Sequence, residues 1–155
     1  MLSHPNKELK DHLENVSRLG LNIFNNRKTI WSNNKTVIDT LEIILLTHDF
    51  GKATSFFQEY IKDTQNEKFK KTPHIDLKKH GEFSAIWAYY KVRNKIKDEK
   101  MGLIAYMIVK KHHGNLTDFR AQDMALHEEK ELNFLEQLNN FDFEYFNLAE
   151  EKDDF

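Results

Sequence analysis

The stretch THDFGK, residues 47–52, is the centre around which the chain is organised. It follows an apolar run at residues 41–46, so the sequence predicts a buried helix that ends by placing His48 and Asp49 side by side. An imidazole offers a nitrogen ligand to a divalent metal, and a carboxylate has two oxygens with which it can bridge two ions. The pair therefore predicts a metallohydrolase. This hypothesis requires further histidines of the sequence to serve as metal ligands.

Composition limits the class of protein. The 155 residues fit one domain, and 23 basic against 25 acidic residues give a net charge of -2, without the basic excess of many nucleic-acid-binding proteins. The sequence has no cysteine, which excludes disulfides, thiolate metal sites and cysteine nucleophiles. No apolar run approaches the roughly 18 residues of a membrane span, and the first residues lack a signal-peptide pattern. We therefore expect a cytoplasmic protein without membrane contact.

Apolar periodicity predicts an all-α fold, a compact helical bundle. Glycines and prolines are few, and few segments alternate in polarity. Ile30 and Trp31 are expected to turn inward from the first loop, and the aromatic residues at 56–61 are expected to be core rather than a surface for stacking bases. The expected helices run over about residues 7–24, from 34–36 up to the His-Asp pair, and over 56–61, 79–92, 101–113 and 116–138.

The candidate metal ligands stand at or near the ends of different expected helices. A helical bundle can bring such ends to one site, and two adjacent imidazoles directly after an apolar helix are hard to assign to solvent exposure alone. The set exceeds one tetrahedral zinc site but suffices for a binuclear centre bridged by Asp49. It suits Fe, Mn, Co, Ni or Zn better than Ca, with Mg also admitted. The candidates are His12, His48, Asp49, His80, His112 and His113.

The remaining histidines and the basic segment of the chain are not expected to belong to the metal site. His4, near a terminus, His74, in a basic loop, and His127, on a polar helix, are expected not to be ligands. The basic segment 62–79 is expected to be a solvated loop, with contact to a phosphate backbone through Lys70 and Lys71 as the alternative.

In order and spacing, the motifs resemble the HD nuclease domain of the CRISPR-associated helicase-nuclease of type I systems. The resemblance rests on His12, HDFGK at 48–52, Phe57-Gln58 in the following helix, HGEFSA at 80–85 and KKHHG at 110–114. A lone His-Asp pair would be weak, because the whole HD phosphohydrolase superfamily shares it, and the later motifs are more specific. The match covers about residues 7–116. It implies an HD domain at 1–140, followed at 141–155 by an acidic tail that is expected to fray.

What the resemblance implies is an HD-type helical fold and metal-dependent cleavage of single-stranded DNA in CRISPR interference. Lys52 would face the scissile phosphate. The implied partners are single-stranded DNA, a helicase domain or subunit and the guide-RNA surveillance complex. Carried over by motif, one metal would be held by His12, His48 and Asp49, and the second by His80, His112 and His113, with Asp49 shared.

One part of the family pattern has no counterpart in this sequence, namely a further aspartate on a later helix. Asp118 and Asp123 follow the His-His pair too closely, and Asp142, Asp153 and Asp154 lie in poor contexts. Either the chain is truncated before that residue, or the first metal site is incomplete. Two alternatives to the nuclease therefore stay open: an HD phosphohydrolase acting on nucleotides or cyclic dinucleotides, and an inactive, truncated domain that binds DNA or a partner.

Overall fold

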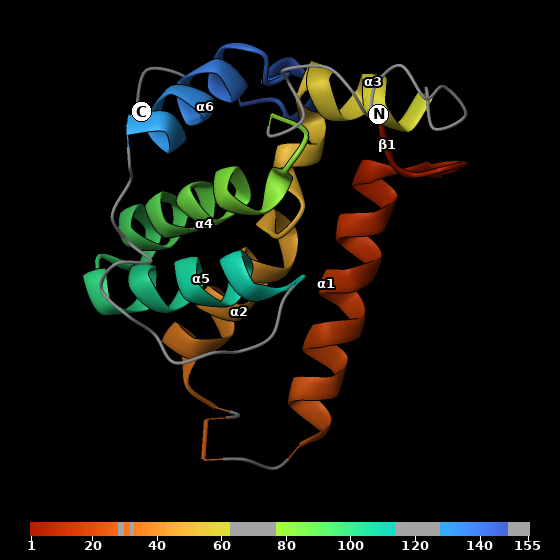
Figure 1. The fold of residues 1–155 in the computed structure, drawn as a ribbon. Coiled ribbons are helices and arrows are strands. Elements are labelled where there is room, and N and C mark those ends of the chain that lie inside the picture. Colours follow the sequence, from red (N-terminus) through yellow and green to blue (C-terminus); the bar gives the residue numbers. More distant parts are fainter. Residues whose placement is uncertain (28–29, 32, 63–76, 114–127, 149–155) are drawn as a thin grey trace.

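Six α-helices build the part of the chain that the computed structural model describes, which is residues 1–27, 30–31, 33–62, 77–113 and 128–148. Helices α4 and α5 lie side by side on one side of the molecule, and α1 lies on the other side (Figure 1). Helices α3 and α6 lie across one end of the bundle. The predicted all-α bundle is confirmed. The helices are α1 (Leu9–Asn26), α2 (Lys35–Thr47), α3 (Ser55–Lys62), α4 (His80–Ile96), α5 (Glu99–Lys111) and α6 (Glu128–Asn139), with short 3-10 helices η1 (Phe50–Ala53) and η5 (Glu144–Phe146).

A small antiparallel hairpin precedes the first helix and was not expected from the sequence. It pairs β1 (Leu2–His4) with β2 (Lys7–Glu8), and the turn between them places Asn6 at a positive φ of 63°. Asparagine tolerates this left-handed conformation better than most residues. Strands of two or three residues are too short to show an alternating pattern, which is why periodicity gave no signal for them.

Polar side chains define where two of the helices begin. The Oδ1 of Asn34 accepts a hydrogen bond from the backbone N–H of Val37 at 3.2 Å, so α2 is capped within the expected 34–36 window. Asp98 caps α5 through the backbone N–H groups of Lys100 and Met101. As a result α5 runs over 99–111, whereas the sequence predicted a helix over 101–113. His112 and His113 therefore follow directly after the helix. The predicted helix at 116–138 is described only from residue 128 onward.

Helix α4, rather than the more apolar α2, is the central helix. Every residue from Phe83 to Ala88 is buried, whereas α2 buries only one face. Through this burial α4 joins two core clusters, one shared with α2 and α5, the other with the start of α1, η1 and the segment after α6. The aromatic stripe of α3 contributes Phe57 and Ile61 to the interior, as predicted.

The predicted apolar stripe of α1 reaches the core only in its first half. Leu9 and Leu13 are buried, but Leu19 is 62% and Ile23 50% exposed. The second half of α1 instead meets α2 through Gly20, where an added Cβ would lie 2.6 Å from a methyl carbon of Leu45. Close helix contact at a small residue thus replaces contact through the larger side chains.

The inward placement expected for the first loop is wrong. Ile30 is 87% and Trp31 52% exposed. The loop lies at the end of α1 far from η1 and α3, beyond the reach of either core cluster (Figure 1). Aromatic and branched residues are buried only on average, so residue type alone did not place these two side chains.

Residues 141–148, expected to be part of an acidic tail, pack on the core. Phe141 and Phe143 are buried in the cluster that contains Leu9 and Phe83, and the ring of Phe146 stacks on Phe50 with centroids 4.4 Å apart. Residues 149–155 lie outside the described residues, so the position of the domain boundary stays a prediction.

Among the described residues, no helix combines the length and the apolar character needed to cross a membrane.

Candidate metal centre

Asp49 lies at the centre of a cluster of imidazoles and is only 2% exposed. Its Oδ2 atom faces the helix α1 side, 3.0 Å from Nε2 of His12 and 3.5 Å from Nε2 of His48. The same oxygen lies 2.8 Å from the Nζ of Lys52. One carboxylate oxygen is thus committed to a first group of nitrogen atoms.

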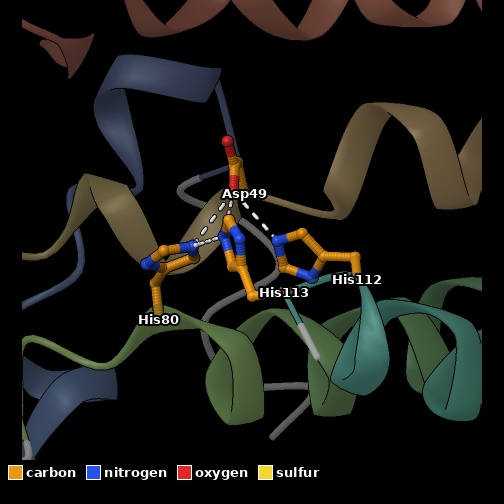
Figure 2. Close-up of side chains that lie close together, drawn as sticks. All are labelled: Asp49, His80, His112 and His113. Carbon is orange, nitrogen blue, oxygen red and sulfur yellow. Dashed lines mark hydrogen bonds and ion pairs between the residues drawn. The ribbon is translucent and has the colours of Figure 1, made fainter. Parts of the chain in front are cut away.

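The other carboxylate oxygen faces a second group. Oδ1 of Asp49 lies 3.1 Å from Nε2 of His80, 3.3 Å from Nε2 of His112 and 3.9 Å from Nε2 of His113. Figure 2 shows the three rings converging on the carboxylate, and the Nε2 atoms of His80 and His113 approach each other to 2.8 Å. In each group the donor atoms all lie within 4.8 Å of one another. The six candidate ligands therefore lie in two groups that share Asp49, which is the division that the family resemblance implies, and their binding of metal stays a prediction.

Helix ends deliver most of these side chains. His48 caps the end of α2, still with helical backbone angles, and Asp49 follows at the start of η1. His80 is the first residue of α4, and the His112-His113 pair follows the last residue of α5. Only His12 comes from within a helix, one turn into α1. A rigid helix lies behind each ligand, which limits how far the ring can move.

Backbone carbonyls fix the tautomer of two ligands. The Nδ1 of His48 donates to the carbonyl oxygen of Leu45 at 2.8 Å, and the Nδ1 of His112 donates to that of Val109. An imidazole that carries its proton on Nδ1 presents a lone pair on Nε2, which is the atom aimed at Asp49 in both residues. These hydrogen bonds prepare the two rings to bind a cation.

The cluster holds Asp49 ionised. Burial raises the pKa of this carboxyl, but the nitrogen atoms of His112, His80 and Lys52 that surround it outweigh burial and leave the pKa well below its ordinary value. The side chain of Lys52 is itself buried, 4% exposed, so its ammonium and the carboxylate neutralise each other away from water. A permanently charged carboxylate is the state that bridges cations.

Four of the imidazoles, those of His12, His48, His80 and His113, are shifted toward the neutral form by a lowered pKa. Burial disfavours the imidazolium and lowers the pKa of His12, His48 and His80, although the charge of Asp49 acts in the opposite direction. The pKa of His113 falls to about 4, because its ring loses water within the cluster and because His112 and His80 disfavour another positive charge. Neutral imidazole is the metal-binding form, so the site is ready for cations at neutral pH.

Contact between η1 and α4 joins the two groups. The backbone N–H of Gly51 donates to the Oγ of Ser84 at 2.9 Å, and Ser84 is completely buried. The small residues of the HGEFSA motif therefore let α4 approach the turn that carries Asp49.

The chemistry of the donors fits transition metal ions. Each group combines neutral nitrogen donors with one carboxylate oxygen, which suits Mn, Fe, Co, Ni or Zn and is unlike the all-oxygen set that Ca prefers. A charged carboxylate with one oxygen in each group can serve two ions at once. The groups differ in size, since the one with His12 and His48 has three donors and the other has four.

The roles predicted for the lysines toward a phosphate are not tested by the structure. Lys52 lies beside Asp49 as expected, but its ammonium is buried and bonded to the carboxylate, so a role toward a phosphate stays a prediction. Lys70 and Lys71 lie outside the described residues.

The further aspartate of the family pattern has no candidate near the three-donor group in the described part of the chain. Asp142 accepts a hydrogen bond from the backbone N–H of Tyr145 and forms part of the segment after α6. Asp118, Asp123, Asp153 and Asp154 fall outside the described residues, as do His74 and His127.

Sequence reasoning set aside one histidine that the structure brings to the cluster. The ring of His4 lies edge-on to that of His12, with centroids 5.2 Å apart. Its position near the chain start gave no signal, because the hairpin that carries it was not predictable. A hollow of about 830 Å³ lies nearby between Gln58 and Phe143, but none of the candidate ligands lines it, so it is not the metal centre.

Comparison with known proteins gives one match. The family model described as Cas3, HD domain matches residues 7–152, nearly the whole chain. No curated protein and no solved structure matches this chain.

Proposed function

The chain belongs to the HD-domain family of Cas3, a family of metal-dependent nucleases, and from this premise we propose that it hydrolyses phosphodiester bonds of single-stranded DNA at a binuclear His/Asp centre. The observation that supports the proposal best is the position of Asp49, whose two oxygens face two separate groups of imidazoles. Such a carboxylate is suited to bridging two cations.

Each side chain has a distinct part in the proposed reaction. Bound cations would act as Lewis acids toward the phosphodiester and lower the pKa of a water molecule. Asp49 holds the two groups together and, being ionised, compensates the positive charge that would gather there. The neutral histidines supply lone pairs, with those of His48 and His112 oriented by their Nδ1 hydrogen bonds. Lys52 offsets negative charge that develops on the phosphoryl group.

The second group is open to a substrate. His113 is 60% exposed, while the side chains of His12, His48, His80 and His112 are between 13% and 17% exposed. A DNA strand would therefore approach over His113, whereas Asp49 stays covered. A single strand fits this approach better than a duplex, because one phosphate must come close to a recessed carboxylate.

Cleavage assays with matched variants test the proposal. Single-stranded DNA is incubated with the metal-free chain and with added Mg²⁺, Mn²⁺, Fe²⁺, Co²⁺, Ni²⁺ or Zn²⁺. We expect metal-stimulated cleavage by the wild-type chain and none by Asp49→Asn or His48→Ala. Asp39→Asn is the control, because it removes the same charge from an exposed ion pair with Lys35 on the preceding helix. Metal-stimulated cleavage by Asp49→Asn or His48→Ala at the wild-type rate would show the proposal to be wrong.

Parallel assays with other phosphate esters separate the nuclease from the alternatives. Preference for nucleoside triphosphates or cyclic dinucleotides over single-stranded DNA would assign the same centre to an HD phosphohydrolase instead. A folded chain that binds neither Mn²⁺ nor Co²⁺ would indicate an inactive binding domain.

The proposed partners follow from the family. We propose that the chain acts in the cytoplasm in CRISPR interference, beside a helicase domain or subunit that a guide-RNA surveillance complex recruits to DNA. Lys70 and Lys71 are proposed to contact the DNA backbone. Replacing both by glutamate should then weaken DNA binding and reduce the slope of log affinity against log salt concentration, and an unchanged slope would dismiss this contact.

A further inference from the structure

His4 extends the row of imidazole rings beyond the six candidate ligands. Each ring in the row packs edge-on or tilted against the next, and His4 occupies the outer end, next to His12. The separation of His4 from His12 falls within the range of the other steps of this row. The successive centroid distances are 5.2 Å from His4 to His12, 5.3 Å to His48, 5.5 Å to His112, 5.7 Å to His80 and 4.9 Å to His113.

His12 lacks, at its second ring nitrogen, the backbone partner that His48 and His112 have. Its Nε2 points to Asp49, but its Nδ1 is buried, and no residue in the described part of the chain offers that atom a hydrogen bond. His48 and His112 differ, since a carbonyl oxygen holds the Nδ1 of each. A ligand ring is normally oriented by a hydrogen bond at its second nitrogen. The orientation of His12 must therefore come from packing.

The hairpin holds His4 in the position from which it can orient His12. The buried Ser3 donates its Oγ–H to the carbonyl oxygen of Lys7 at 3.3 Å, so Oγ is left to accept from the Nδ1 of His4, also at 3.3 Å. His4 is exposed, but the strand that carries it is not free to move away.

Gln58 ties this strand to the turn that carries Lys52. Its Oε1 accepts from the backbone N–H of Leu2 at 2.9 Å, and its Nε2 donates to the carbonyl oxygens of Leu2 at 2.8 Å and of Lys52 at 2.7 Å. A single buried amide thus fixes β1 relative to the metal centre.

We propose that His4 is a positioning residue for the three-donor group: its ring, held by the amino-terminal hairpin, keeps the Nε2 of His12 aimed at the cation. The inference rests on the metal centre of the proposed function and adds to it. The three-donor group depends more on each ligand than the four-donor group does, so the loss of His4 affects one ion and spares the other.

Calorimetric titration of the metal-free full chain with Mn²⁺ tests the inference. His4→Ala is expected to weaken one class of site about 10-fold, the lower end of the effect of removing a partner that orients a ligand, and to leave the other class unchanged. His4→Phe keeps a ring against His12 but has no nitrogen, and is expected to restore affinity to within about threefold of wild type. His80→Ala identifies the four-donor group, since it should weaken the class of site that His4→Ala spares.

The outcomes separate this inference from the proposed function. If wild type and His4→Ala bind Mn²⁺ equally, the positioning role is wrong and the metal centre stands. If His4→Phe is as weak as His4→Ala, a ring nitrogen of His4 is required, and the inference that the packing of its ring positions His12 is wrong. If wild type binds no Mn²⁺, both proposals fall. A far-ultraviolet circular dichroism spectrum of each variant shows that the comparison is between folded chains.

Discussion

Gly51 packs directly against the backbone of His80. A Cβ atom at residue 51 would lie 2.7 Å from the carbonyl oxygen and 2.9 Å from the Cα of His80, closer than real Cβ atoms approach their neighbours. The turn that follows Asp49 and the first residue of α4 thus meet with no room for a side chain. The requirement for glycine in THDFGK is therefore one of space, and it comes from the residue that begins HGEFSA.

Replacing Gly51 by alanine should push the two ligand-bearing segments apart. Because backbone atoms must shift, we expect the free energy of unfolding to fall by about 1–3 kcal/mol, together with weaker Mn²⁺ binding. Gly81→Ala is the matched control, because nothing lies within 4 Å of a Cβ at that position in α4. Alanine favours a helix over glycine by about 1 kcal/mol, so this variant should be as stable as wild type or more so. Urea unfolding measures both, and equal stability of the two variants would contradict the prediction.

Removing the charge of Asp49 should destabilise the metal-free chain. Asp49→Asn leaves the ammonium of Lys52 buried without a counter-charge, and breaking a buried ion pair from one side costs about 3–5 kcal/mol. The double variant Asp49→Asn with Lys52→Met should recover much of that loss, because both buried charges are then gone. Urea unfolding in the presence of a chelator measures the two variants. A double variant less stable than Asp49→Asn alone would rule out this explanation.

Metal binding should stabilise the fold. An ion that binds the native but not the unfolded chain adds about 2.7 kcal/mol when its concentration is 100 times its dissociation constant. We therefore expect Mn²⁺ to raise the melting temperature of wild type and a chelator to reverse the rise. Asp49→Asn should show no such shift, since both groups lose their shared oxygen. A shift of wild-type size in that variant would place the bound metal elsewhere.

Stability of the metal-free chain should increase with pH between about 4 and 6.5. The pKa of His113 is about 4 in the folded chain, and those of His12, His48 and His80 are also lowered, against about 6.5 when unfolded. Between these values the unfolded chain binds more protons, so acid favours unfolding, and the effect is absent above the unfolded value. Chemical unfolding at a series of pH values, with chelator present, measures the slope. A slope of zero across this window would mean that the imidazoles are not held neutral.

The convergence of the candidate ligands was largely predictable because most of them stand at helix ends. Apolar periodicity predicted the helix before His48 and the helix before His112, and adjacent ligands at such ends leave few directions in which to point. Their division into two groups rested on the family resemblance, and the structure places them in that arrangement. No local pattern could have predicted that His4 approaches His12, because the contact depends on a hairpin held by Gln58 from another helix.

The errors in the fold have a common physical cause. Trp31 and Leu19 are apolar, and Phe141 stands among acidic residues, but which of them is buried depends on whether another element lies opposite. Leu19 and Ile23 in the second half of α1 are largely exposed, whereas α4 presents Phe83 and Trp87 to the segment after α6. The apolar character of a residue indicates a preference for burial. The arrangement of the helices decides whether the residue is buried.

The stacking of Phe146 on Phe50 has a consequence for biosynthesis. Phe50 directly follows Asp49, and its ring packs against residues of the segment after α6. This segment is the last part of the described chain to be synthesised. Contacts between distant parts of a chain form late in folding, because the intervening chain must first be closed into a loop. A nascent polypeptide therefore carries all six candidate metal-binding side chains before it carries Phe141 and Phe146, whose rings pack against Phe50 beside Asp49.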